Sequence, residues 1–231
     1  MTKPEMARSS RGVAIEHLAV TIPVGSLHLE GDLSIPTAAK GAVLFAHGSG
    51  SSRRSPRNRL VADLLNESGL ATLLMDLLTD DEQQVDLQTA HLRFDIPLLA
   101  KRLVAITQWL ARHQEAANLK IGHFGASTGA AAALVAAAEV PSLVRAVVSR
   151  GGRPDLASTA LSKVEAPTLL IVGGADSVVL DLNQHAMSLM HCENALKLVP
   201  GATHLFEEPG ALQKVAELAR DWFLEKLGSN S

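Results

Sequence analysis

The sequence predicts an α/β fold: a mostly parallel, eight-stranded sheet, opened by an antiparallel hairpin and covered by helices on both faces. Three observations predict it. Short apolar runs that end in glycine recur along the chain, as in strands buried on both faces. Stretches with helical spacing separate these runs, and this alternation is typical of parallel sheets. A stretch in which apolar and polar residues alternate precedes them all.

That alternating stretch, residues 15–36, is expected to form the hairpin. Its apolar and polar residues alternate around a turn at Gly25-Ser26, which is a hairpin signature. Pro23 and Pro36 stand where the strands would end, and a missing backbone N–H is tolerated there. The hairpin therefore supplies the antiparallel part of the sheet.

The remaining elements alternate between strand and helix to the end of the chain. Apolar runs predict strands at 42–46, 70–78, 119–124, 144–150, 167–172 and 195–199. Helical spacing predicts helices at 55–69, 94–115, 127–139, 181–192 and 208–227, with a short helical piece between 152 and 166. Parallel strands need such crossover connections, so the two patterns support each other.

The domain organisation is expected to be simple. Residues 1–12 are polar and charged and are predicted to be a disordered N-terminal lead-in. No linker or internal repeat follows, which leaves 13–231 as a single domain. Residues 79–93 show no clear periodicity, and in a compact α/β domain such a stretch is more often a functional loop than a boundary.

Composition and charge narrow the possible partners. The net charge of −3 gives no reason to expect nucleic acid or an anionic membrane as a partner. The one cysteine, Cys192, excludes an internal disulfide framework and a cysteine-based zinc site. It suits a reducing cytoplasm, where we expect the protein, because the polar start does not resemble a secretory signal. No apolar run approaches the length that spans a bilayer.

Residues able to do chemistry follow four of the predicted strands. They are His47-Gly48-Ser49-Gly50, Gly125-Ala126-Ser127-Thr128-Gly129, Asp176 and His204. Because open parallel sheets bind ligands at the carboxyl ends of their strands, these residues are expected to meet at one edge. The sequence thus predicts a serine, an acid, a histidine and a glycine-rich loop in one site.

Ser127 has two interpretations. As a nucleophile it would sit on a sharp strand-to-helix turn, which needs residues without bulk at Gly125 and Gly129. The helix N-terminus would then stabilise developing negative charge. Alternatively, the glycines serve only tight packing and Ser127 is a helix N-cap. The acid and the histidine at neighbouring strand ends favour the nucleophile.

His204 and Asp176 are the predicted base and acid. His204 follows the last predicted strand, whereas the other histidines lie in hairpin, loop, helix or strand contexts, and His123 is expected to be buried. Asp176 directly follows an apolar run and is favoured over its rivals Asp181 and Asp155. In this arrangement the histidine takes the serine proton while the carboxylate orients the imidazole.

The glycine-rich loop is predicted to supply an oxyanion hole. The backbone N–H groups of Ser49 and Thr128 are the candidate donors, and His47, Gly48 and Gly50 are expected to line the substrate site. The structural alternative is a plain strand-to-helix turn.

Arginines at the same edge could bind substrate. Arg53, Arg54 and Arg57 follow the glycine-rich loop, and Arg150 and Arg153 follow another strand. They could attract a carboxylate or phosphate, and Arg53, Arg54, Arg150 and Arg153 are therefore candidate substrate-binding residues. Salt bridges to nearby aspartates that hold the loops in place are the equal alternative.

Together, these residues resemble the α/β-hydrolase superfamily and, within it, the dienelactone hydrolase-like family. The resemblance rests on "HGSGSSRRSPRNR", "GASTGAAAAL", "SRGGRPDL", "PTLLIVGGAD" and "PGATHLFEEPG". It implies the α/β-hydrolase fold and hydrolysis of esters or lactones without metal or organic cofactor, and it maps nucleophile, acid and base onto Ser127, Asp176 and His204. Dienelactone hydrolases proper have a cysteine nucleophile, which argues against dienelactone as the substrate. Only about 16 residues lie where relatives insert a lid, so no lid domain is expected.

The predicted function is that of a serine hydrolase of the carboxylesterase or lactonase type, acting on small acyl esters through an acyl-enzyme. A histidine base predicts activity that rises from mildly acid to neutral pH. An acyltransferase or activated-amide hydrolase on the same site, or a non-catalytic binding protein with this fold, stays open, as does a homo-oligomer. The expected partner is a small ester, lactone or related acyl compound.

Overall fold

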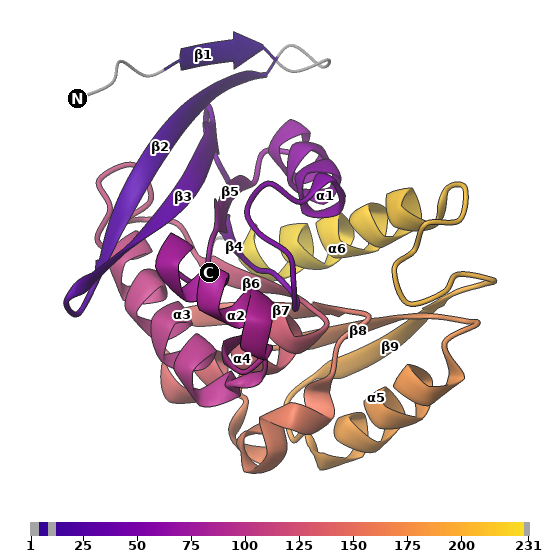
Figure 1. Cartoon of the computed structure of the whole chain (residues 1–231). Coiled ribbons are helices and arrows are strands. Elements are labelled where there is room, and N and C mark those ends of the chain that lie inside the picture. Colours follow the sequence, from indigo (N-terminus) through magenta and orange to yellow (C-terminus); the bar gives the residue numbers. More distant parts are fainter. Residues whose placement is uncertain (1–4, 9–12, 229–231) are drawn as a thin grey trace.

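The computed structural model of the chain describes residues 5–8 and 13–228. Within them, one nine-stranded sheet in the order β1-β2-β3-β5-β4-β6-β7-β8-β9 crosses the molecule (Figure 1). Its strands are β1 (Glu5–Arg8), β2 (Ala14–Val24), β3 (Leu27–Pro36), β4 (Ala42–Ala46), β5 (Ala71–Met75), β6 (Ile121–Ala126), β7 (Val144–Arg150), β8 (Thr168–Gly173) and β9 (Asn194–Val199).

The helices are α1 (Pro56–Glu67), α2 (Asp80–Thr89), α3 (Ile96–Leu110), α4 (Thr128–Glu139), α5 (Ser177–Leu189) and α6 (Ala211–Leu227). Shorter 3-10 helices are η1 (Leu92–Phe94) and η2 (Pro154–Lys163). Among the described residues, no helix combines the length and the apolar character needed to cross a membrane.

The strand directions follow the prediction. β2 and β3 form the antiparallel hairpin, and β3 pairs antiparallel with β5. β5, β4, β6, β7, β8 and β9 run parallel to one another. All eight predicted strands are present, so the predicted fold class is confirmed.

A ninth strand, β1, lies inside the predicted lead-in. Glu5–Arg8 pairs antiparallel with residues 14–17 of β2. Four residues are too few to show an alternating pattern, and the strand depends on backbone pairing with a neighbour rather than on its own sequence. The expectation of disorder is therefore not met at these residues, and the rest of the lead-in, 1–4 and 9–12, lies outside the described residues.

Helices cover both faces of the sheet. α1 and α6 lie together on one face, where Val61 and Phe223 belong to the same buried cluster as Phe124 of β6 (Figure 1). α3 and α4 cover the other face, in clusters that also include residues of η2 and α5. β4, β5, β6 and β8 are buried along their whole length, in agreement with their continuous apolar sequences.

Residues 79–93, expected to form a loop, form α2 and η1 instead. The Thr79 hydroxyl accepts a hydrogen bond from the Glu82 N–H, and the Glu82 carboxylate accepts one from the Thr79 N–H. α2 buries only Asp86, so no apolar stripe reveals the helix in its sequence. The signal that predicts it is this capping box, Thr-x-x-Glu.

Ion pairs attach α2 to the rest of the protein. Arg102 of α3 binds both carboxylate oxygens of Glu82, at 2.5 and 2.7 Å, and also donates to the carbonyl oxygen of Leu77. The hydrogen bonds from Arg102 hold the pKa of Glu82 below its usual value. Arg93 binds Asp86 at 2.6 Å. α2 is therefore held by polar contacts rather than by a core of its own.

His123 is buried inside β6, as the sequence predicts. It is 0% exposed, and its Nε2 lies 2.9 Å from Thr107 Oγ1. Its Nδ1 lies 3.4 Å from the carbonyl oxygen of Ala133, so both ring nitrogens face a polar group inside the core. Burial lowers the pKa of His123 from 6.5 to about 4, which means that the native state strongly favours the neutral imidazole.

This burial makes stability depend on pH. The pKa of His123 is lower in the folded protein than in the unfolded chain, so the neutral imidazole contributes fully to the free energy of unfolding above pH 6.5. This contribution is lost as the pH falls toward about 4, because over that range only the unfolded chain takes up the proton. We expect the free energy of unfolding to drop by about 2 kcal/mol more in the wild type than in His123→Gln between about pH 6.5 and about pH 5. Urea unfolding across this range measures the difference. Equal pH slopes in the two proteins would contradict the assignment.

Candidate active site

Ser127 lies on a sharp turn between β6 and α4. Its backbone has φ 49° and ψ −121°, a region that residues other than glycine rarely adopt. A Cβ on Gly125 would stand 2.4 Å from Cα of Ala130, and a Cβ on Gly129 would stand 2.3 Å from the carbonyl oxygen of Ala46. Only glycine fits at these two positions, for the reason that the sequence suggested.

The side chain of Ser127 does not serve as a helix cap. Ser127 is the N-cap residue of α4, but its hydroxyl makes no capping hydrogen bond. An unused cap side chain and a strained backbone are both more typical of a reactive residue than of a structural one. The Oγ at this end of α4 stands where the helix dipole favours negative charge.

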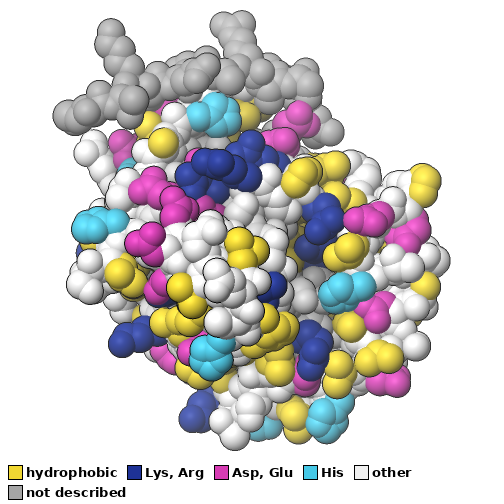
Figure 2. Space-filling view, viewed as in Figure 1, with side chains coloured by type: hydrophobic (Ala, Val, Ile, Leu, Met, Phe, Trp, Pro, Cys, Tyr) yellow, Lys and Arg dark blue, Asp and Glu magenta, His cyan; other side chains and the backbone are white. Residues whose placement is uncertain are grey.

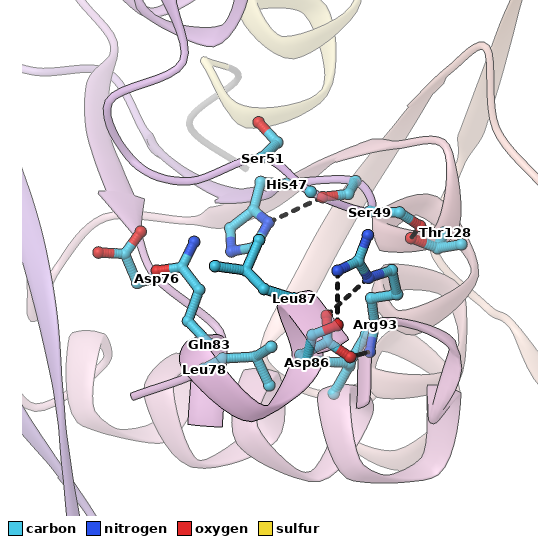
Figure 3. A pocket seen from close by; sticks show the side chains of 13 residues that line it. His47, Ser49, Ser51, Asp76, Leu78, Gln83, Asp86, Leu87, Arg93 and Thr128 are labelled. Atoms are coloured by element: carbon cyan, nitrogen blue, oxygen red, sulfur yellow. Dashed lines mark hydrogen bonds and ion pairs between the residues drawn. The ribbon is translucent and has the colours of Figure 1, made fainter. Parts of the chain in front are cut away.

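The loop after β4 lies against this turn. A Cβ on Gly48 would stand 3.0 Å from Cβ of Ser127. Ser49 Oγ and Thr128 Oγ1 are 3.1 Å apart and share a hydrogen bond (Figure 3). The fold thus brings together the two residues predicted to donate to an oxyanion, with Ser127 next to both.

His47 positions this loop. Its Nε2 accepts a hydrogen bond from the Leu77 N–H at 3.0 Å, and its Nδ1–H donates to the carbonyl oxygen of Gly48 at 3.0 Å. Burial lowers the pKa of His47, which keeps the imidazole neutral as these two bonds require. Both ring nitrogens are therefore engaged with backbone, although the sequence suggested a substrate-binding role.

Asp176 and His204 meet at the carboxyl ends of β8 and β9. His204 Nδ1–H donates to Asp176 Oδ2 at 2.8 Å, and Asp176 Oδ1 accepts from the Val179 N–H at 3.4 Å. The carboxylate therefore caps α5 and holds the imidazole at the same time. The rival Asp155 is paired with Arg153 instead, at 2.8 Å. With Nδ1 bound to Asp176, Nε2 of His204 is the nitrogen left to accept a proton.

Gly151 lets the His204 loop approach the serine turn. It has φ 50°, and a Cβ on it would stand 3.1 Å from the carbonyl oxygen and 3.6 Å from Cε1 of His204. On the other side, the Ser127 N–H donates to the carbonyl oxygen of Arg150 at 3.3 Å. In the described residues no hydrogen bond joins Ser127 Oγ to His204, and such catalytic bonds commonly tighten only when substrate binds. Sequence reasoning missed Gly151, although two glycines after a strand were a visible signal.

The arginines at this edge have different environments. The Arg53 N–H donates to Asp76 Oδ1 at 2.8 Å, and its guanidinium pairs with the same carboxylate. Arg153 binds Asp155 at 2.8 and 2.9 Å. The salt-bridge interpretation therefore describes Arg53 and Arg153. Arg54 is exposed and makes no ion pair within the described part of the chain, whereas Arg150 is buried.

A small pocket opens between the glycine-rich loop and α2 (Figure 3). The loop contributes His47, Gly48, Ser49, Gly50 and Ser51, and Thr128 closes the side toward Ser127. α2 and its surroundings contribute Leu78, Gln83, Asp86, Leu87 and Arg93. Ser127 and His204 do not line this pocket. It adjoins the reactive residues through Ser49 and Thr128, so it can hold a part of a substrate that extends from them.

Charge and possible metal ligands are dispersed. On the face shown in Figure 2, basic side chains form one small cluster bordered by acidic ones, and the others are scattered among apolar and polar side chains. Across residues 5–8 and 13–228, no group of three or more His, Cys, Asp or Glu side chains is placed to hold a metal ion.

Comparisons with known proteins agree with the fold described above. The profile of the family described as "Dienelactone hydrolase family" matches residues 29–227. A crystal structure of a dienelactone hydrolase from Anabaena variabilis superimposes with a TM-score of 0.91 at 59% identity, covering 92% of this chain and 99% of that one. Est1E from Butyrivibrio proteoclasticus shares the fold, with a TM-score of 0.75 at 18% identity, covering 90% of this chain and 98% of that one.

Two curated relatives come from strains of Mycobacterium tuberculosis. Both are provisionally named phosphoribosyl transferases and are 57% identical over 208 residues, which cover 90% of this chain. The match covers 46% of each relative, so the chain spans less than half of their length. The name phosphoribosyl transferase therefore belongs to proteins that are about twice as long as this chain.

Proposed function

Because this chain belongs to the dienelactone hydrolase family, we propose that it is a serine hydrolase that cleaves small carboxylic esters or lactones through an acyl-enzyme. The hydrogen bond between Asp176 and His204, at the sheet edge that also carries the strained Ser127, is the observation that carries this proposal. Each of these residues follows a different strand, so a structural role for all three would be a coincidence.

In the proposed reaction, Ser127 Oγ attacks the acyl carbon of the ester while His204 Nε2 takes the hydroxyl proton. Asp176 keeps the Nδ1–H tautomer and stabilises the imidazolium. The tetrahedral oxyanion receives hydrogen bonds from the backbone N–H groups of Thr128 and Ser49. The C–O bond to the leaving group then breaks, and His204 returns its proton to the departing alcohol.

Hydrolysis of the acyl-enzyme repeats these steps with water as the nucleophile. His204 removes a proton from the water, the hydroxide adds to the acyl carbon, and the bond to Ser127 Oγ breaks with return of the proton to that oxygen. The products are a carboxylic acid and an alcohol, and no cofactor enters the balance.

The structure around the site favours small substrates. Between β7 and β8 the chain forms only the short η2, so no helical lid covers the serine from that side. Coverage comes from α2, which lines the adjoining pocket with Gln83 and Leu87. We propose that this pocket receives the acyl or the alcohol part of the ester.

Covalent labelling tests the proposal. A fluorophosphonate probe is expected to label the native protein once, at Ser127, because an activated serine attacks phosphorus as it attacks an acyl carbon. Peptide mass spectrometry locates the label, and heat-unfolded protein is the control for non-specific reaction. Turnover of p-nitrophenyl esters of graded chain length, beside lactones and activated amides, then defines the substrate. Absence of labelling, or labelling elsewhere, would overturn the assignment.

A further inference from the structure

Asn183 is a polar side chain on the buried face of α5. It is 0% exposed, and the other buried residues of this helix, Val179 and Ala186, are apolar. Its Nδ2 donates to two carbonyl oxygens, that of Val179 at 2.7 Å and that of Gly152 at 3.0 Å. Its Oδ1 is buried and has no hydrogen-bond partner in the described residues. An apolar side chain would avoid the cost of this unpaired acceptor, so the asparagine is present for its donors.

The loop after β7, residues 151–153, contacts both reactive parts of the site. It connects β7 to η2. The Arg153 N–H donates to the carbonyl oxygen of Ser127 at 3.1 Å. On the other side of the loop, a Cβ on Gly151 would stand only 3.6 Å from Cε1 of His204. The position of this loop therefore sets how closely the serine turn and the histidine approach each other.

Backbone groups hold this loop in place. A Cβ on Gly152 would stand 2.7 Å from Cβ of Ala130, so the loop packs directly on the first turn of α4. The Gly151 N–H donates to the carbonyl oxygen of Ile171 at 2.8 Å. Because two of its three residues are glycines, side chains of the loop contribute little to its anchoring. The amide of Asn183 supplies a hydrogen bond that joins the loop to α5.

α5 also carries the acid of the proposed triad. Asp176 caps the helix by accepting the Val179 N–H through Oδ1, and its Oδ2 accepts His204 Nδ1–H. The carbonyl oxygen of the same Val179 accepts from Asn183. Seven residues, about two turns, separate the acid from the asparagine. One rigid helix thus holds the acid and base at its first residue and the loop beside the nucleophile two turns later.

We propose that Asn183 is a positioning residue for the reaction: it fastens the 151–153 loop to α5 and so fixes the approach of Ser127 Oγ to His204 Nε2. It touches no reacting atom and acts through the Gly152 carbonyl. Proton transfer between serine and histidine needs a separation of about 3 Å, and a displacement of about 1 Å can slow a reaction about 100-fold. This role rests on the proposed serine hydrolase function and adds a residue to it.

Replacement of Asn183 with leucine tests this role, because leucine is similar in size but leaves the Gly152 carbonyl without its donor. Labelling to completion with the fluorophosphonate probe counts the active sites, so that kcat is expressed per site. We expect kcat for p-nitrophenyl acetate to fall about 10- to 100-fold while KM stays within about twofold of the wild-type value, since proton transfer is impaired and binding is not. The rate of labelling at Ser127 is expected to fall in parallel.

Asn66→Leu is the matched control. Asn66 is also a buried asparagine on a helix, α1, and its Oδ1 accepts from the Thr72 hydroxyl at 3.1 Å. Thr72 lies near the amino end of β5, at the opposite edge of the sheet from the reactive residues. This variant is expected to lose stability but to keep the wild-type kcat per site. Equal losses of kcat in the two variants would overturn the proposal, as would a raised KM with unchanged kcat in Asn183→Leu.

Asn183→Asp decides the question if the leucine variant does not fold. A protonated carboxyl can donate to the Gly152 carbonyl, whereas an ionised one cannot. Burial raises the pKa of the introduced carboxyl, so the ratio of the variant's kcat per site to that of the wild type is expected to be low near about pH 8 and to rise toward about pH 6. A ratio near one at about pH 8, or a low ratio that does not rise, overturns the proposal. Failure of the parent function appears separately, as absence of labelling at Ser127 in the wild type.

Discussion

Replacing Ser127 with alanine is expected to lower kcat/KM for ester hydrolysis about 10⁴- to 10⁶-fold. The variant lacks the oxygen that attacks the acyl carbon, so only positioning and oxyanion stabilisation remain. The hydrogen bond between His204 and Asp176 involves no atom of Ser127 and is expected to persist. Steady-state hydrolysis of p-nitrophenyl esters measures the loss, and thermal unfolding verifies that the variant is folded.

Ser158 provides a matched control for this substitution. Its backbone has φ 48° and ψ −126°, nearly the conformation of Ser127, but it lies in η2, in a pocket with His185 and His191. Ser158→Ala is expected to keep full activity. Adding His204→Ala to Ser127→Ala should cause little further loss, because the two groups act as a unit. Full activity in Ser127→Ala, or a loss in Ser158→Ala alone, would refute the assignment.

Replacing Gly129 with alanine is expected to lower the free energy of unfolding by about 3 kcal/mol or more. The new Cβ would stand 2.3 Å from the carbonyl oxygen of Ala46 and 2.4 Å from that of His47. Both are backbone atoms, so relief requires moving α4 away from β4 and its loop. We expect the thermal midpoint to fall by about 10 °C. The remaining folded protein should also lose activity, because the movement separates Thr128 from Ser49.

Gly174→Ala is the matched control for Gly129→Ala. Gly174 also lies at the carboxyl edge, but the nearest atoms to a Cβ there are 3.3 Å away or farther. Its thermal midpoint is expected to stay within about 3 °C of the wild type. Equal midpoints for Gly129→Ala and the wild type would show that the turn adapts to a side chain, contrary to the packing described above.

The fold was predictable because each central strand has a recognisable pattern in its own short stretch of sequence. β4, β6 and β8 are mostly apolar and are buried along their whole length, and each is followed by glycine or by a chemically reactive residue. The placement of Asp176 beside His204 follows from strand order alone, since parallel strands deliver their carboxyl ends to one edge. The sequence pattern is therefore sufficient to predict a strand where burial on both faces requires a nearly continuous apolar run.

Elements held by pairing or polar contacts were less predictable. β1 exists through backbone bonds to β2, and α2 through the pairs of Glu82 with Arg102 and Asp86 with Arg93. Neither leaves an apolar pattern. The different environments of Arg53 and Arg150 depend on which carboxylate lies within reach of each, which is a property of the assembled edge and not of the neighbouring sequence.

Because α2 is attached by polar contacts, selection for stability and selection for substrate preference act on different residues of this helix. Because α2 buries only Asp86, most of its residues can be exchanged without opening a cavity in the core. Yet Gln83 and Leu87 face the pocket beside the glycine-rich loop. Substitutions on α2 can therefore alter which molecules the protein accepts while the sheet keeps its stability. Evolution can diversify the substrate range here at low thermodynamic cost, provided that Glu82 and Asp86 keep their arginine partners.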